Sequence, residues 1–124
     1  MDERRRFERL NFSASIRWDV AGESNDAFSN NTGTTRDISA GGIRVILNAT
    51  VKAGDILDIE LGLPGQDPIR AKGRVVWVEK FQIMGVEDET RFEGGIEFLD
   101  ISEASRSRIN SFILGVKKEP KKDS

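Results

Sequence analysis

The residues whose chemistry stands out first are four arginines near the N-terminus, at positions 4, 5, 6 and 9. An arginine side chain carries a permanent charge and a planar fork of N–H donors. It can bind a phosphate, bind the O6/N7 edge of guanine, or stack on a purine ring. Four of them ahead of a strand would form an anion-binding arm. Taken alone, the segment is explained more simply by a solvated basic terminus, or by a nonspecific nucleic-acid or membrane tether.

A second group of polar and small residues occupies positions 37–42, between two apolar stretches. Asp37 and Ser39 are two residues apart, so on an extended chain their side chains point to the same side and place a carboxylate beside a hydroxyl. Gly41 and Gly42 permit a positive φ and a close approach of the backbone to a ligand. Taken alone, this segment is explained more simply as a turn capped by Asp and Ser.

The residue types that are missing limit the chemistry further. The 124 residues include no histidine and no cysteine, which removes the commonest general base, the commonest zinc ligand, disulfides and thiolate nucleophiles. Glu87, Asp88 and Glu89 are adjacent and cannot all converge on one ion, so we predict a solvated turn there and no metal site. We therefore expect a binding protein and not an enzyme, with no cofactor.

Charge is distributed unevenly along a chain of net charge −2. Basic residues concentrate in residues 1–10 and 117–124, on either side of an acidic body, whereas a broad nucleic-acid-binding face would show the opposite distribution. No apolar run reaches the roughly 20 residues that a membrane span needs, and no apolar region follows the first charges as in a secretory signal. These patterns predict a cytoplasmic protein that binds neither DNA nor a membrane.

The alternation of apolar and polar residues predicts the elements that must position these groups. Segments with the period of a strand are residues 12–20, 34–38, 43–47, 57–63, 69–79 and 94–99. The polar stretch 22–33 is predicted to be a long loop, or a loop extended by ragged strand ends. The consecutive apolar residues 75–78 indicate a bulge or burial on both faces. Six short strands favour a closed antiparallel barrel, because an open sheet would leave two unpaired edges.

The hydrophobic period becomes helical towards the C-terminus. Ser102 is a suitable N-cap, and Gly115 is expected to end the helix. Apolar side chains spaced i, i+3, i+4 and i+7 form one stripe, made of Ile109, Phe112, Ile113 and Val116. We expect this stripe to pack on the barrel.

These elements make up one predicted domain. It is all-β: a six-stranded antiparallel β-barrel with one C-terminal α-helix, spanning residues 11–116, with the helix at about 102–115. Residues 1–10 are expected to be a flexible arginine-rich arm, and residues 117–124 a disordered charged tail.

Together, the two polar segments resemble the signature pair of the PilZ-domain family, RxxxR followed some tens of residues later by (D/N)xSxxG. Residues 5–9 match the first motif and residues 37–42 the second, in the right order, before a strand and between strands. Residues 73–77 look like the family's late strand, and residues 95–102 with the following helix look like its ending. The resemblance covers residue 4 to about 114. It implies a six-stranded barrel that binds the second messenger cyclic di-GMP.

The resemblance also implies a role for each matching residue. Arg5 and Arg9 should hold the phosphates and guanine edges of cyclic di-GMP. Asp37 should accept a hydrogen bond from a guanine N–H edge, and Ser39 should donate one to the ligand. Gly42 should make the turn that brings the segment at residues 37–42 close to the ligand.

Two further residues extend the implied site. In similar proteins, an arginine directly before the first motif is associated with binding an intercalated pair of ligand molecules, so Arg4 would stack on the extra guanine. Trp77 offers another stacking surface, because an aromatic residue is common at this point in the family. A place in the barrel core explains Trp77 equally well.

The predicted function is that of a cyclic di-GMP receptor or adaptor that binds one or two ligand molecules. It would signal to an unidentified downstream protein when the ligand orders the N-terminal arm. Motility, attachment in biofilms and polysaccharide export are all outputs of the family, and nothing in the sequence selects one. Two alternatives remain: a PilZ-like protein-interaction module that binds no nucleotide, and a small barrel that binds single-stranded nucleic acid. The acidic body and only nine aromatic residues argue against the second.

Overall fold

The computed structural model describes residues 8–21, 31–82 and 90–118, which form seven strands and one helix. In chain order these are β1 Arg9–Asn11, β2 Ser15–Val20, β3 Thr32–Ser39, β4 Gly42–Leu47, β5 Ile56–Gly62, β6 Ile69–Gln82, β7 Thr90–Asp100 and α1 Glu103–Lys118. In these ranges no helix is both long and apolar enough to cross a membrane.

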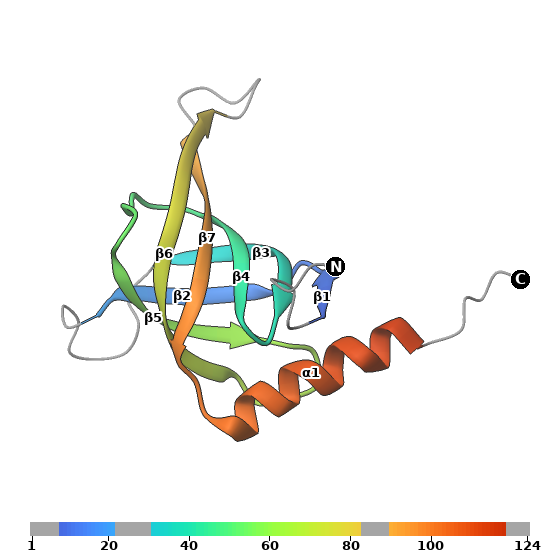
Figure 1. The fold of residues 1–124 in the computed structure, drawn as a ribbon. Coiled ribbons are helices and arrows are strands. Elements are labelled where there is room, and N and C mark those ends of the chain that lie inside the picture. The colour runs from blue at the N-terminus through green and yellow to red at the C-terminus, as the bar shows by residue number, and fades with distance from the viewer. Residues whose placement is uncertain (1–7, 22–30, 83–89, 119–124) are drawn as a thin grey trace, which may run out of the picture.

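Six of the strands close into an antiparallel barrel. Neighbours follow the order β3-β2-β5-β6-β7-β4, and β3 pairs with β4 to complete the ring. Closure leaves these six strands without a free edge. β1 is an extra strand that pairs with β3 beside β2 (Figure 1). The predicted all-β barrel with a C-terminal helix is therefore confirmed.

The strand predicted at residues 12–20 begins later, as β2 at Ser15, and residues 12–14 form a break between β1 and β2. At this break the side chain of Thr35 on β3 makes the hydrogen bonds that the backbone ladder does not. The Thr35 hydroxyl donates a hydrogen bond to the Phe12 carbonyl at 2.6 Å and accepts one from the Ala14 N–H at 2.8 Å. Thr35 is buried, so these two backbone groups have little access to water. Thr35 thereby keeps β1 aligned with β2 along β3.

The barrel interior is filled by apolar side chains from alternate strand positions. The fully buried members of this core include Ile16, Trp18, Ile38, Val45, Leu47, Leu57, Ile59, Leu61, Ile69 and Val75. Because Ile38 points inward, its neighbours Asp37 and Ser39 lie on the outer side of the barrel. The core thus fixes which face of β3 carries the polar pair.

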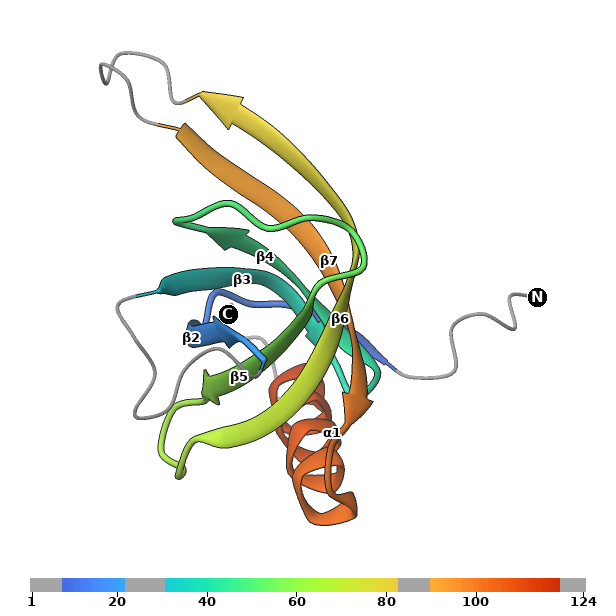
Figure 2. The same ribbon diagram turned by 90° about the vertical axis from the view of Figure 1, so that its left-hand side faces the viewer.

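Helix α1 covers one end of the barrel, as both ribbon views show (Figures 1 and 2). Ile109 and Ile113 are fully buried, and the Phe112 ring packs edge-on against Phe12, with 5.1 Å between ring centroids. The Ser102 hydroxyl accepts a hydrogen bond from the Ser105 N–H at 3.0 Å, which confirms the predicted N-cap.

Several predicted boundaries are wrong. Arg9 and Leu10, expected in the flexible arm, belong to β1. Residues 32–33 belong to β3, in agreement with the alternative of a loop extended by strand ends. Gly115 does not end the helix, which continues to Lys118 and so includes the first residues of the expected tail. Val116, expected on the packing stripe, is exposed. Residues 1–7, 22–30, 83–89 and 119–124 lie outside the described residues.

The hairpin of β6 and β7 is the longest feature of the sheet and extends beyond the rest of the barrel (Figure 1). Its register shifts between Val75 and Trp77, which confirms the bulge predicted from the consecutive apolar residues. Val75 faces the core, whereas Val76 and Trp77 are exposed. The bulge therefore places Trp77 on the outer surface and excludes the alternative of a core position.

Candidate ligand-binding site

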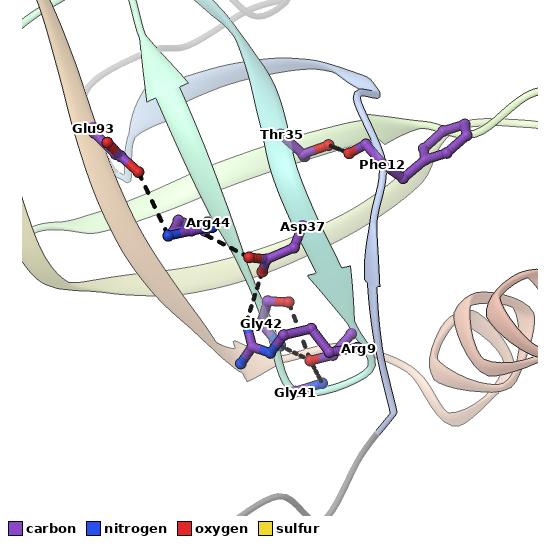
Figure 3. Close-up of polar contacts among 9 residues, drawn as sticks. Arg9, Phe12, Thr35, Asp37, Gly41, Gly42, Arg44 and Glu93 are labelled. Atoms are coloured by element: carbon purple, nitrogen blue, oxygen red, sulfur yellow. Dashed lines mark hydrogen bonds and ion pairs between the residues drawn. The ribbon is translucent and has the colours of Figure 1, made fainter.

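The two sequence motifs meet where β1 pairs with β3. Arg9 lies opposite Ser39, and Asn11 lies opposite Asp37. This register brings Arg9 Nη1 to 2.6 Å from Asp37 Oδ1 (Figure 3). The Asp37 side chain is buried, while that of Arg9 is about half exposed. The last arginine of the first motif and the first residue of the second therefore form one charged pair.

Arg44 is a second partner of Asp37 that we did not predict. The β3–β4 hairpin pairs Ser39 with Gly42 and Asp37 with Arg44. Arg44 Nε lies 3.1 Å from Asp37 Oδ2, although this buried nitrogen makes the ion pair without a hydrogen bond. The sequence contained a signal for this contact. If the two residues after Ser39 form the hairpin turn, Ser39 pairs with Gly42, and the pairing two residues further along each strand is Asp37 with Arg44.

Glu93 of β7 extends this arrangement. Its Oε2 lies 3.8 Å from Arg44 Nη1 and 3.9 Å from Arg36 Nη1. Figure 3 shows Arg44 between the carboxylates of Asp37 and Glu93. The result is a row of alternating charges across β1, β3, β4 and β7, in the order Arg9, Asp37, Arg44, Glu93 and Arg36. Neither Arg36 nor Glu93 was predicted to belong to the site.

Cations and anions in this row differ in depth. The exposed fractions are 47%, 48% and 40% for the side chains of Arg9, Arg36 and Arg44, against 5% for Asp37 and 21% for Glu93. The carboxylates lie deeper than the guanidinium groups, which face solvent. An approaching anion therefore meets positive charge first, even though the charges nearly balance in number.

Ser39 organises the turn between β3 and β4. Its Oγ accepts hydrogen bonds from the N–H groups of Gly41 at 3.1 Å and Gly42 at 3.2 Å, and donates to the Gly42 carbonyl at 3.3 Å. The hydroxyl would have to leave that carbonyl to donate to a ligand, the role we expected of it. Ser39 is therefore occupied in shaping the turn at residues 37–42, which we call the shelf.

Gly41 and Gly42 do not use the positive φ that glycine permits, since among the described glycines only Gly54 and Gly65 have one. Gly42 serves another purpose. A Cβ on Gly42 would lie 2.3 Å from the Ile96 carbonyl oxygen, so the missing side chain lets β4 approach β7 closely. Gly42 thus secures the barrel beside the shelf, where we had expected it to make a turn.

Trp77 lies on the same face of the sheet as the charged row. Gly95 of β7 pairs with Arg44 on one side and with Trp77 on the other. A Cβ on Gly95 would lie 2.3 Å from Trp77 Nε1 and 2.9 Å from two other indole atoms, so the indole ring lies directly over the glycine. Trp77 is 40% exposed and can offer ring surface to a flat ligand.

Other predicted residues lie outside the described ranges. These are Arg4, Arg5 and the acidic residues at 87–89. Within the described part of the chain, no group of acidic side chains is arranged to hold a metal ion. Glu8, inside the arginine motif, accepts a hydrogen bond from Lys117 of α1 at 2.7 Å, and this lowers the pKa of the Glu8 carboxyl.

The PilZ domain family matches residues 3–115 of the chain. This chain therefore belongs to the PilZ domain family, as the two motifs suggested. No curated protein matches it.

Several solved structures share the fold. The inhibitor of motility MotI/DgrA of Bacillus subtilis has a TM-score of 0.70 and 19% identity, over 94% of this chain and 53% of that one. The PilZ domain of YcgR from Escherichia coli with c-di-GMP has a TM-score of 0.69 and 16% identity, over 94% and 93%. The K. pneumonia MrkH–c-di-GMP complex has a TM-score of 0.72 and 17% identity, over 100% and 56%. The chain thus spans about half the length of MotI and MrkH, and nearly all of the YcgR domain.

Proposed function

We propose that this chain is a receptor or adaptor domain for cyclic di-GMP, and that it acts by binding and not by catalysis. One observation carries the proposal: Arg9 of the first motif contacts Asp37, on the shelf formed by the second motif, on the outer face of a PilZ barrel. The similar structures of YcgR and MrkH, which contain c-di-GMP, support the same ligand class.

The ligand carries two phosphates and two guanines, and each finds a matching group on this face. The exposed edges of Arg9 and Arg44 suit a phosphate or the O6/N7 edge of guanine. Asp37 suits the N–H edge of guanine, and Trp77 suits stacking on a purine. Because Arg9 occupies one Asp37 oxygen and Arg44 faces the other, the ligand must displace one of them to reach Asp37.

The proposed signal is the ordering of the residues before β1, where Arg4 and Arg5 would close over the ligand and bind one molecule or an intercalated pair. The Glu8–Lys117 contact supports a route from this segment to α1, since it links the start of the barrel to the last turns of the helix. A downstream protein in the cytoplasm would recognise the changed surface. Its identity and the cellular output stay open.

Isothermal titration of the wild-type chain with cyclic di-GMP, with GTP and with a single-stranded oligonucleotide tests the proposal. We expect saturable binding of cyclic di-GMP alone, with one or two molecules per chain. Arg5→Ala and Arg9→Gln should each weaken binding at least about tenfold, because each removes a charge-assisted contact. The matched control Arg70→Gln alters an exposed arginine at the start of β6, where it pairs with Glu60 of β5, and this variant should bind normally.

Two outcomes would contradict the proposal. Absence of cyclic di-GMP binding by a folded chain would favour a PilZ-like protein-interaction module without nucleotide. Tighter binding of the oligonucleotide than of cyclic di-GMP would favour the nucleic-acid-binding alternative.

A further inference from the structure

We propose that Arg36 and Arg44 form a second anion subsite on this face, beyond the two sequence motifs, and that Glu93 sets its strength. The inference rests on the proposed function, because the anion in question is a phosphate of cyclic di-GMP. It adds Arg36 and Glu93 to the site, and it places Arg44 beside Arg36 at one phosphate. The arginines strengthen binding, and Glu93 weakens it.

A bulge in β3 directs Arg36 to this subsite. The β3–β4 register pairs Thr35 with Val45 and Asp37 with Arg44, which leaves Arg36 as the extra residue between them. A bulge of this kind places two successive side chains on the same face of a sheet, and bulges often aim a side chain at a functional site. Arg36 is exposed, and its guanidinium group reaches Glu93 across β4.

The subsite lies between the groups already assigned to the ligand. Asp37, Arg44, Gly95 and Trp77 follow one another across β3, β4, β7 and β6 in a single row of paired residues. Glu93 is two residues from Gly95 on the same strand and faces the same side. A dinucleotide that contacts both Arg9 and Trp77 therefore crosses Arg44 on the way.

The contacts of Glu93 are looser than those of Asp37. Its oxygen lies 3.8 and 3.9 Å from the two guanidinium groups, beyond hydrogen-bonding distance, whereas Asp37 holds Arg9 at 2.6 Å. Contacts this long do little to orient a guanidinium group, but the negative charge still lowers the positive potential around it. Removing the charge of Glu93 should therefore strengthen anion binding with little loss of positioning.

Titration of cyclic di-GMP into full-length Glu93→Gln, Arg36→Gln, Arg44→Gln and the triple variant tests this subsite. Each titration is run at about 0.01 M and about 1 M salt, where the screening lengths are about 30 Å and about 3 Å. The matched control is Glu60→Gln, which removes a carboxylate that also lies between two arginines, Arg17 and Arg70. Thermal unfolding confirms that each variant is folded.

At low salt we expect Glu93→Gln to bind cyclic di-GMP about 3- to 10-fold more tightly than wild type, and the gain to vanish at high salt. Arg36→Gln and Arg44→Gln should each bind more weakly, the triple variant should show no gain, and Glu60→Gln should match wild type. The subsite is overturned if folded Glu93→Gln binds cyclic di-GMP no more tightly than wild type, or if Glu60→Gln gains as much affinity as Glu93→Gln. In either case binding by the wild type would still uphold the proposed receptor function. Failure of the wild type to bind would overturn both.

Discussion

Asp37 joins two arginines from different strands: Arg9, 28 residues earlier in the chain, pairs with Oδ1 at 2.6 Å, and Arg44 lies 3.1 Å from Oδ2. The carboxylate is buried beneath them and offsets part of their positive charge, and each of its oxygens already faces a guanidinium group. Ligand binding must therefore exchange one set of charged contacts for another. Such an exchange favours a ligand that offers both phosphates and a purine N–H edge, since it can satisfy the arginines and the carboxylate together.

Asp37→Ala should destabilise the barrel and weaken ligand binding. Loss of the buried carboxylate leaves two guanidinium groups without their inner partner, and we expect a cost of about 2 kcal/mol in urea unfolding. Cyclic di-GMP binding should fall at least about tenfold, and Asp37→Asn should recover part of it because its amide oxygen still accepts. The control Asp58→Ala breaks an exposed pair with Lys72 and should cost about 0.5 kcal/mol. Equal costs for the two alanine variants would contradict this view of Asp37.

Thr35→Val should loosen β1. The change keeps the size of the side chain but leaves the Phe12 carbonyl and the Ala14 N–H without a partner, which should cost about 1–3 kcal/mol in urea unfolding. Hydrogen exchange at the Ala14 amide should accelerate, and cyclic di-GMP should bind more weakly because Arg9 lies on β1. The exposed neighbour Thr34 provides the control. A Thr35→Val variant as stable as Thr34→Val would show that the hydroxyl does not hold the strands together.

Gly95→Ala should displace the indole of Trp77. The new Cβ would come too close to three atoms of the five-membered ring, so the indole must move and Trp77 should become more accessible to acrylamide quenching. Losing this stacking surface should weaken cyclic di-GMP binding about 3- to 10-fold. Gly62→Ala is the matched control, because a Cβ there comes no closer than 3.6 Å to another group. If the indole moved and affinity did not change, Trp77 would have no part in binding.

The Glu8–Lys117 contact predicts a dependence on pH. Lys117 lowers the pKa of the folded Glu8 carboxyl from its ordinary value of 4.5. The contact therefore stabilises the folded chain above about pH 4.5, and the effect is lost as the pH falls through the lowered value. In a carbon-detected NMR titration, Glu8 should titrate below 4.5 in wild type and close to 4.5 in Lys117→Gln. The Lys72→Gln control should leave it unchanged, and identical midpoints in wild type and Lys117→Gln would refute the contact.

Local patterns in the sequence predict the barrel, the bulge before Trp77 and the N-cap at Ser102, because each depends on neighbouring residues. The motif residues Arg9, Asp37 and Ser39 were also found in this way. Gly115 shows the limit of local signals: glycine is tolerated inside a helix at a cost of about 1 kcal/mol, and α1 continues past it to Lys118.

The missed part of the site depends on strand registers that link distant residues. Arg44 meets Asp37 through the β3–β4 hairpin, and Glu93 meets both arginines only because β4 pairs with β7, nearly fifty residues later. The bulge that directs Arg36 to the outer face is not marked by a run of apolar residues in the sequence, unlike the bulge before Trp77. The sequence motif therefore identified the shelf, whereas Arg44 and Glu93 reach it only through the pairing of β4 with β3 and β7.

The most direct test of the central claim is an NMR titration of the ¹⁵N-labelled chain with cyclic di-GMP, following the backbone amides, the arginine side chains and the indole N–H groups. The account predicts that the largest shifts map to Arg9, the shelf at residues 37–42, Arg44, Gly95 and the Trp77 indole. Shifts confined to the opposite side of the barrel, on β2 and β5, or no shifts at saturating ligand, would contradict it.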